Sequence, residues 1–337
     1  MLHWPRAWSG QYEGVHELAA IGRAGALVAA VALIAGLGGG CGSQTSAAST
    51  DHRAAAAQSA GGASHTVTVA PPKPVSSTPV VRSPAGAGRE WRVVATVGVK
   101  PVAWVAERSG VTLMRFDQHL THLALHAGSS EPGGSGWHYG AAIGPGEIHH
   151  VVAGFNGGFK LTYGSVGFLS YGRVAAPISS GLGSIVTYRD GATQIGTWHE
   201  GVPSQGRAIA SVRQNLHLLV DRGAPAASVQ SCVQSCWGST LGGGSEVARS
   251  ALGIDGEGRL VWGGGESLSP AGLAHGLISA GVLRAVELDI NPFWVAGYLY
   301  KHHPGGPTGL PVVPGQHGIA GMLLTPNPRD FFTVLTN

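Results

Sequence analysis

Short runs of apolar residues that alternate with polar ones recur from residue 90 to the end of the chain. Several of them have the period of two that is typical of a β-strand with one buried face. These runs are residues 91–97, 111–116, 122–126, 151–155, 183–188, 217–220 and 259–262. The Asp-Gly pairs at 190–191 and 255–256 predict hairpin loops, because such pairs tolerate the positive φ that these turns need.

One segment has helical spacing instead. Ser269 and Pro270 have the chemistry of an N-cap and a first helical residue, and Gly281 that of a C-terminal stop. Between them the apolar residues recur every three or four positions, at Leu273, Ala274, Leu277 and Ile278. A strand is expected directly afterwards, over 283–290. The whole pattern predicts an α+β fold: a sheet-dominated single domain with a few helices packed on the sheet.

The N-terminus differs from the rest of the chain. Residues 24–40 carry no charge, and their apolar core at 27–37 is shorter than the roughly 20 residues that span a membrane. Small residues and then Cys41 follow, a pattern that resembles the lipobox of bacterial lipoproteins, whose cysteine is acylated. Residues 1–41 are therefore expected to be a signal peptide or lipoprotein signal, with Cys41 lipidated, or an uncleaved membrane anchor. Both alternatives predict export, to the outer face of the membrane, the cell wall or the medium.

Residues 42–89 consist mainly of Ala, Ser, Gly, Thr and Pro. Bulky apolar side chains are too few to offset the entropy of ordering, so this segment is expected to be a disordered linker. Residues 90–337 are long enough for one domain with its own core. The 55 glycines and 20 prolines of the chain favour many turns and short strands.

The chain has 3 cysteines, Cys41, Cys232 and Cys236. With Cys41 lipidated or removed, the other two form a pair at C-x-x-x-C spacing. In an oxidising compartment such a pair is expected to form a local disulfide. A zinc site would need two further ligands, and the residues around this pair supply none.

Charge argues against a nucleic-acid partner, since the formal net charge is only +3 and no cluster of Lys and Arg stands out.

The chain has 16 histidines. His119, His122 and His126 have helical spacing, but their segment is better explained as a strand. No H-E-x-x-H, G-x-S-x-G or Walker pattern occurs, so we expect no metal and no cofactor. The sequence does not determine the oligomeric state.

The strand expected over 283–290 carries candidate chemistry. Its side chains alternate, so Glu287, Asp289 and Asn291 share one face, with successive carboxylates about 6–7 Å apart. That separation suits an acid/base pair acting on one substrate atom. It also suits two anions that share one cation. The structural alternative is an ion pair, or a turn that Asp289 and Asn291 organise just before Pro292.

Two glycine-rich segments are suited to binding an anion. The glycines of 156–160 allow backbone N–H groups to approach a ligand, and Lys160 adds a cation. The second segment, 241–245, precedes Arg249, and backbone donors with a forked cation are what a phosphodiester needs. In a glycine-rich chain each of these segments is also compatible with an ordinary turn.

In chain order, N-G-G-F at 156–159, A-R-S-A-L-G at 248–253 and L-D at 288–289 are similar to the signature of the phosphodiester glycosidase family. The resemblance spans most of residues 90–337. The family includes the lysosomal uncovering enzyme, which removes N-acetylglucosamine from a sugar phosphodiester, and many bacterial exopolysaccharide-linked proteins. The positions that match those the family keeps are Asn156, Gly157, Gly158, Arg249, Gly253 and Asp289.

The chain departs from the family pattern after Asp289. The usual motif continues as D-G-G-G-S, whereas here residues 289–294 are D-I-N-P-F-W, without the glycines and the serine. This form is similar to that of a bacterial branch that also carries W-G-x-T-L-G, at 237–242, and Q-N-L, at 214–216. For this branch, binding of glycans without cleavage is an open alternative.

We therefore expect an exported hydrolase that acts on a sugar phosphodiester or a related cell-envelope glycan. Arg249 is expected to hold the phosphate, Asp289 and Glu287 to supply acid/base or nucleophilic carboxylates, and Asn156 to orient the sugar or a carboxylate. The remaining substrate-binding candidates are Gly157, Gly158, Lys160, Asn291 and three aromatic walls, Trp237, Phe293 and Trp294. The alternative is a non-catalytic envelope glycan-binding protein on the same fold.

Overall fold

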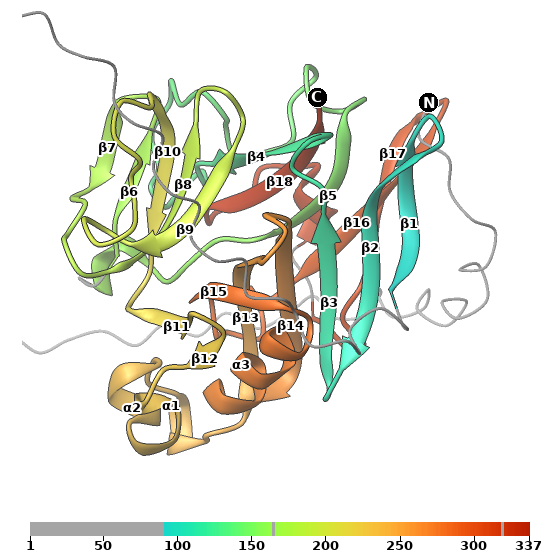
Figure 1. Ribbon diagram of the computed structural model, residues 1–337. Coiled ribbons are helices and arrows are strands. Elements are labelled where there is room, and N and C mark those ends of the chain that lie inside the picture. Colours follow the sequence, from blue (N-terminus) through green and yellow to red (C-terminus); the bar gives the residue numbers. More distant parts are fainter. Residues whose placement is uncertain (1–90, 164–165, 318–319) are drawn as a thin grey trace, which may run out of the picture. The chain divides into compact units, whose positions relative to one another are not determined.

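The computed structural model describes residues 91–163, 166–317 and 320–337 (Figure 1). The expected leader with Cys41 and the expected linker at 42–89 lie outside these residues. In the part of the chain that is described, no helix is long and apolar enough to cross a membrane.

Three antiparallel sheets dominate the described residues, which confirms the sheet-dominated α+β fold. The eight-stranded sheet has the order β1 (Arg92–Val97), β2 (Lys100–Arg108), β3 (Val111–Phe116), β14 (Leu260–Leu268), β13 (Val247–Asp255), β15 (Val282–Glu287), β11 (Leu218–Asp221) and β12 (Ala224–Pro225). One five-stranded sheet has the order β7 (Arg173–Ala176), β6 (Phe168–Ser170), β10 (Ile209–Gln214), β8 (Gly183–Tyr188) and β9 (Thr193–Thr197). The other has the order β17 (Gly306–Pro311), β16 (Gly297–His303), β5 (Val151–Asn156), β18 (Phe331–Thr336) and β4 (Thr121–His126).

The helices lie against the eight-stranded sheet. The predicted helix is α3 (Pro270–Ser279), and the Ser269 hydroxyl caps it by accepting a hydrogen bond from the Gly272 amide at 3.0 Å. Figure 1 shows α3 over β13 and β14, and buried apolar side chains fill the interface. Two single-turn helices, α1 (Ser228–Ser231) and α2 (Val233–Cys236), follow β12. The expected disulfide links Cys232, which lies between these helices, to Cys236 at the end of α2.

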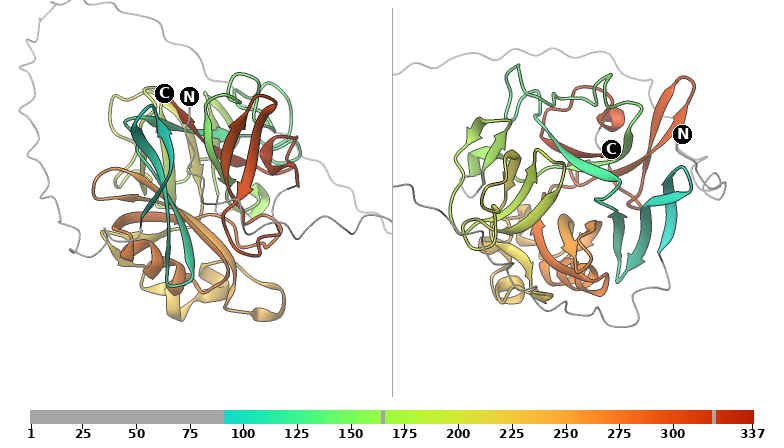
Figure 2. Two further views of the ribbon diagram at one scale, coloured as in Figure 1. Left: turned by 90° about the vertical axis from the view of Figure 1, so that its right-hand side faces the viewer. Right: turned by 45° about the horizontal axis from the view of Figure 1, so that its top comes forward.

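The main core lies where the three sheets meet, and Phe155 of β5 is near its centre. The ring centroid of Phe155 is 6.4 Å from that of Phe116, 5.9 Å from that of Trp262 and 5.7 Å from that of Phe332. The same cluster includes apolar side chains of the β8–β9 sheet. In the right-hand view of Figure 2 the strands of all three sheets surround this region. Burial of each such ring stabilises the fold by about 1.5–3 kcal/mol.

The strand that carries the candidate chemistry is shorter than predicted, because β15 ends at Glu287. Its ladder with β13 nevertheless continues for two residues. The Leu288 amide donates to the Ser250 carbonyl at 2.8 Å, and the Ser250 amide donates to the Asp289 carbonyl at 3.1 Å. The backbone of Asp289 is therefore fixed by the neighbouring strand although it lies beyond the end of β15.

Candidate functional site

Segments that are distant in sequence meet around the end of β15. The end of β5 supplies Asn156, whose Nδ2 donates to the Ser250 hydroxyl of β13 at 2.9 Å. Residues after β10 supply Asn215, whose Nδ2 donates to the carbonyl oxygens of Glu287 and Leu288 at 2.6 and 2.7 Å. These buried amides hold the strand end in place. In this structure Asn156 therefore supports the backbone around Asp289.

The two carboxylate oxygens of Asp289 have different partners. Its Oδ1 accepts hydrogen bonds from the backbone amides of Ile290 and Asn291, at 2.8 and 2.9 Å, so the turn predicted as the structural alternative is present. Its Oδ2 lies 3.1 Å from Nη2 of Arg329. Burial raises the pKa of Asp289, and Arg329 and the two amides oppose that rise. One carboxylate thus organises the turn and also makes an ion pair.

Arg329 is the functional candidate that the sequence did not indicate. Besides its contact with Asp289, its Nη2 donates to the Gly158 carbonyl at 2.8 Å. Its Nε lies 3.2 Å from Oε2 of Glu131, and its guanidinium carbon is 5.5 Å from the ring centroid of Trp294. The side chain is 9% exposed, so this cation is almost completely buried.

Arg249 and Glu287 form a separate ion pair in the interior. Nη1 of Arg249 lies 2.8 Å from Oε1 of Glu287, and both side chains are 0% exposed. Arg249 also donates to the backbone carbonyls of Trp237 and Leu268, at 2.8 and 2.9 Å. Burial raises the pKa of Glu287 to about 7, and the neighbouring Arg249 limits that rise. The charge of Arg249 is therefore balanced by Glu287 within the protein, whereas from the sequence Arg249 is expected to hold a phosphate.

The glycines after Asn156 make room for a second buried ion pair. Nε of Arg213 lies 2.8 Å from Oδ2 of Asp330. A Cβ atom on Gly157 would lie 2.0 Å from that same oxygen. The Gly157 amide donates to the Asp330 carbonyl at 3.0 Å, and the Gly158 amide to Oδ2 of Asp330 at 3.4 Å. These amides, predicted to face a ligand, are instead used in holding the ion pair against the end of β5.

The remaining predicted residues divide into a surface set and a core set. Lys160, Asn291 and Phe293 are exposed, and Trp294 is half-buried beside Arg329. Trp237 is 1% exposed and packs in the core beneath α3, so it cannot stack on a sugar in this conformation. Burying the large apolar ring of Trp237 in the core stabilises the fold more than leaving it exposed to stack on a sugar.

The glycine-rich loop and Arg249 do not act together as predicted. Residues 242–244 are exposed, whereas Arg249 is completely buried. Gly253 is required by packing, because a Cβ atom there would lie 2.5 Å from Cγ1 of Val282. Among the described residues no group of three or more His, Cys, Asp or Glu side chains is arranged to hold a metal ion.

Comparison with known proteins gives structural neighbours only. No protein-family model matches the chain, and no curated protein sequence matches it. The catalytic domain of zebrafish N-acetylglucosamine-1-phosphodiester alpha-N-acetylglucosaminidase, auto-inhibited by its pro-peptide, is 17% identical, with a TM-score of 0.41 over 69% of this chain and 78% of that one. A hypothetical protein from Synechocystis is 12% identical, with a TM-score of 0.36 over 73% and 61%. A Burkholderia pseudomallei protein described as exported is 12% identical, with a TM-score of 0.34 over 71% and 75%. At these values the chain has neighbours in structure, and no family membership follows from them.

Proposed function

We propose that residues 90–337 form an exported hydrolase that acts on a sugar phosphodiester or a related cell-envelope glycan. The observation that carries the proposal is the contact between Oδ2 of Asp289 and Nη2 of Arg329, 3.1 Å apart at the meeting point of several strand ends. A carboxylate whose pKa is raised by burial, held beside an almost completely buried guanidinium, suits proton transfer next to a bound anion.

In the proposed reaction Arg329 binds a phosphate oxygen of the substrate. A guanidinium has five N–H donors in a fixed fork, so it can hold Asp289 and a phosphate oxygen together. Water attacks the anomeric carbon, and Asp289 accepts the proton of that water. The bond between the anomeric carbon and the phosphate oxygen breaks, which releases the sugar and a phosphomonoester.

The surrounding residues are proposed to serve this pair. Exposed Lys160 and Asn291 lie in segments next to the pair and are assigned to substrate binding, with Trp294 and Phe293 as apolar walls. Arg249 and Glu287 are assigned a positioning role, because Glu287 ends the strand that leads to Asp289 and its ion pair with Arg249 is completely buried.

The N-terminal segment is proposed to take the domain out of the cytoplasm. Its uncharged run at 24–40 and the following Cys41 support a cleaved leader with a lipidated cysteine, or an uncleaved anchor. The Ala-, Ser- and Pro-rich segment at 42–89 is proposed to act as the spacer between membrane and domain.

The proposal is tested by measuring turnover and binding on the same substrates. Wild-type protein, Asp289→Asn and Asp221→Asn are assayed on N-acetylglucosamine-1-phosphodiesters, with binding measured by calorimetry in parallel. Asp221 is the matched control, since its carboxylate is on the surface with a side chain 47% exposed. Turnover by wild type and Asp221→Asn but not by Asp289→Asn supports the hydrolase. Binding by all three proteins without turnover contradicts it and favours a non-catalytic glycan-binding protein.

A further inference from the structure

Two adjoining pockets lie beside β4, away from Asp289. Their volumes are about 540 and 260 Å³, and His122 and Tyr139 line both. We call the two together the β4 groove. Leu335 and Thr336, near the end of β18, line its larger part, whereas Asp330 of the candidate site immediately precedes this strand. At about 3.3 Å per residue, the two places are roughly 17–20 Å apart along β18.

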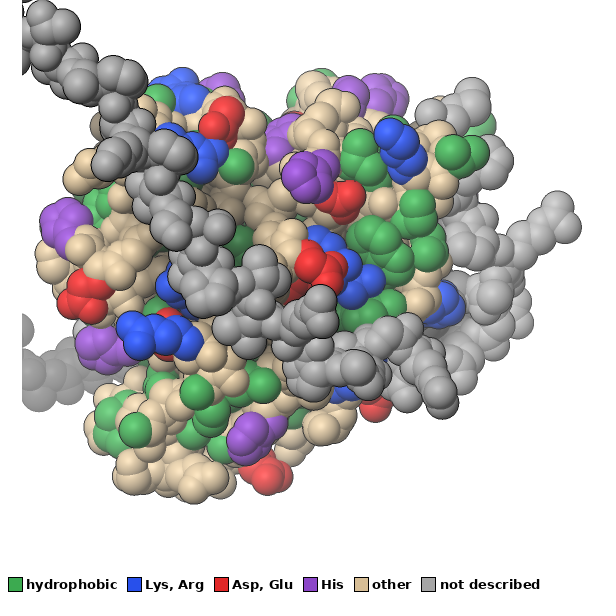
Figure 3. Space-filling view, in the orientation of Figure 1, with side chains coloured by type: hydrophobic (Ala, Val, Ile, Leu, Met, Phe, Trp, Pro, Cys, Tyr) green, Lys and Arg blue, Asp and Glu red, His purple; other side chains and the backbone are tan. Residues whose placement is uncertain are grey.

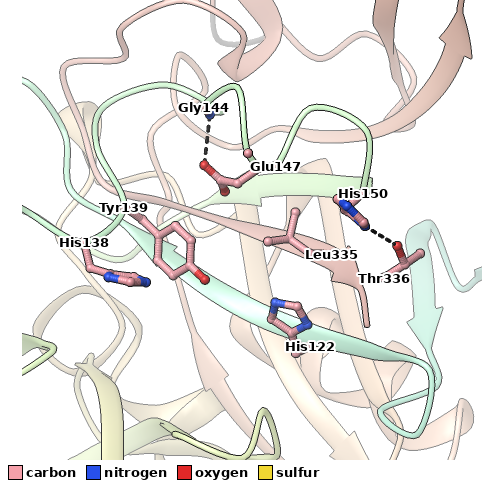
Figure 4. Close-up of a pocket in the computed structure, with 9 residues that line it drawn as sticks. His122, His138, Tyr139, Gly144, Glu147, His150, Leu335 and Thr336 are labelled. Atoms are coloured by element: carbon pink, nitrogen blue, oxygen red, sulfur yellow. Dashed lines mark hydrogen bonds between the residues drawn. The ribbon is translucent and has the colours of Figure 1, made fainter.

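Two histidine rings in the larger pocket are held by hydrogen bonds on one nitrogen each. Nδ1 of His122 lies 2.9 Å from Oδ1 of Asn337, and Nδ1 of His150 lies 3.2 Å from Oγ1 of Thr336. Figure 4 shows both rings at the wall of the pocket, on either side of Leu335. A ring fixed through Nδ1 presents Nε2 as a donor or an acceptor, which is what a ligand hydroxyl requires.

Aromatic rings supply the apolar part of the groove. The ring of Tyr139 meets that of His138 edge to face, with centroids 4.6 Å apart, and His138 stacks on Tyr171 at 3.6 Å. The guanidinium of Arg189 covers Tyr171 at 4.4 Å. These contacts hold Tyr139 in place before any ligand arrives, so binding costs little side-chain entropy. The hydroxyl of Tyr139 is hydrogen-bonded to Tyr171, so the apolar face of this half-buried ring is the part that suits the C–H face of a sugar.

The acidic groups in the groove are already engaged. Oε1 of Glu147 lies 2.9 Å from Nε2 of His126, and its Oε2 accepts a hydrogen bond from the Gly144 amide at 2.9 Å. Asp190 is paired with Arg207 at 2.5 Å. On the face seen in Figure 3, Lys and Arg side chains are interspersed with Asp and Glu and form no patch of one sign. The groove therefore offers hydrogen-bonding groups and ring faces without an excess of charge, which favours a neutral ligand.

We propose that the β4 groove binds a neutral oligosaccharide of at least two sugar units, at a site separate from Asp289. The combined size is typical of ligand sites, which occupy about 300–1,000 Å³. Two sub-pockets that share His122 and Tyr139 suit two consecutive sugar rings, one on each side of the shared residues. This site goes beyond the proposed hydrolase, because binding here requires no turnover.

The test is calorimetry on the full-length protein with three neutral tetrasaccharides: chitotetraose, cellotetraose and mannotetraose. We expect at least one to bind wild type and Asp289→Asn with the same Kd. His122→Ala and Tyr139→Ala are each expected to weaken that binding about tenfold. Tyr139→Phe keeps the ring and is expected to retain most of the affinity. His275→Ala, an exposed histidine on α3, is the matched control and is expected to change nothing.

A second measurement does not depend on whether the variants fold. In wild-type protein labelled with ¹³C at histidine, titration with the bound sugar should shift the resonances of His122 and His150 and leave that of His275 unchanged. The proposal is overturned if none of the tetrasaccharides binds, if Asp289→Asn abolishes binding, or if the His122 resonance does not move. Loss of turnover alone affects only the proposed hydrolase, because this test measures binding.

Discussion

Arg329 pairs with Asp289 across 40 residues of sequence, with Nη2 and Oδ2 3.1 Å apart. The same Nη2 donates to the carbonyl of Gly158, so one guanidinium joins the end of β5 to the residue beyond β15. The cation nearest the candidate carboxylate is therefore Arg329, and the buried Arg249 neutralises Glu287 instead.

Replacing Arg329 should separate the effect of charge from that of geometry. Arg329→Gln removes the cation and is expected to lower kcat/KM about 100-fold or more, because a preorganised charge at a reacting anion is lost. Arg329→Lys keeps the charge without the planar fork and is expected to recover only part of the activity. Steady-state kinetics on a sugar phosphodiester measures both. Wild-type kcat/KM in the Gln variant would show that Arg329 does not bind the substrate.

Substitutions of Arg249 and Glu287 should have non-additive effects on the free energy of unfolding. Arg249→Ala leaves a buried carboxylate without its cation and is expected to lower the free energy of unfolding by about 3–5 kcal/mol. The double variant Arg249→Met with Glu287→Leu removes both charges and is expected to regain most of that loss. Urea unfolding of the single and double variants tests this, and additive effects would argue against the coupling.

The free energy of unfolding should fall as the pH rises, because the buried Glu287 then ionises. Burial raises its pKa to about 7 from the ordinary 4.5, so the folded protein holds a proton that the unfolded chain has released. This contribution is fully present below about pH 4.5 and is lost as the pH rises towards 7. Between pH 5 and pH 8 the Tm of wild type should therefore fall further than that of Glu287→Gln, which cannot ionise. Equal slopes for the two proteins would contradict the raised pKa.

Gly157→Ala should disturb the site through packing. The added methyl group would lie 2.0 Å from Oδ2 of Asp330, and this carboxylate is held in the buried ion pair with Arg213. We expect a loss of about 1–3 kcal/mol in the free energy of unfolding. Gly305→Ala is the control, because a Cβ atom there meets nothing within 4 Å. Equal stability of the two variants would refute the packing argument.

The elements that the sequence predicts correctly are those with local signals. Ser269, Pro270 and Gly281 define the ends of α3 within one short stretch. The alternating runs of β3 and β8 have the predicted bounds. In contrast, β18 is not predicted, because the four apolar residues of its sequence FFTVLT do not alternate with polar ones. Nor is β17, whose glycines and prolines resemble a loop.

The sequence indicates the strand that carries the candidate carboxylates, but not the residues from other segments that contact them. Glu287 and Asp289 were indicated by alternation along a single segment. The burial of Arg249 does not follow from its own segment, because it depends on the contact with Glu287 of the adjacent strand. The ladder between β13 and β15, in which Ala251 lies opposite Glu287, brings these two side chains together. Arg329 reaches Asp289 only because β18 pairs with β5, a contact between segments far apart in sequence. No local pattern around 327–330 indicates such a contact.

Under the proposed function, Asp289 carries out proton transfer in the hydrolysis of a sugar phosphodiester. The most direct test follows an N-acetylglucosamine-1-phosphodiester by ³¹P NMR with equal amounts of wild type and Asp289→Asn, after both show the same Tm. Wild type is expected to convert the phosphodiester signal to that of a phosphomonoester, and the variant to do so about 100- to 10,000-fold more slowly. Equal rates for the two proteins, or an unchanged phosphodiester signal with wild type, would contradict it.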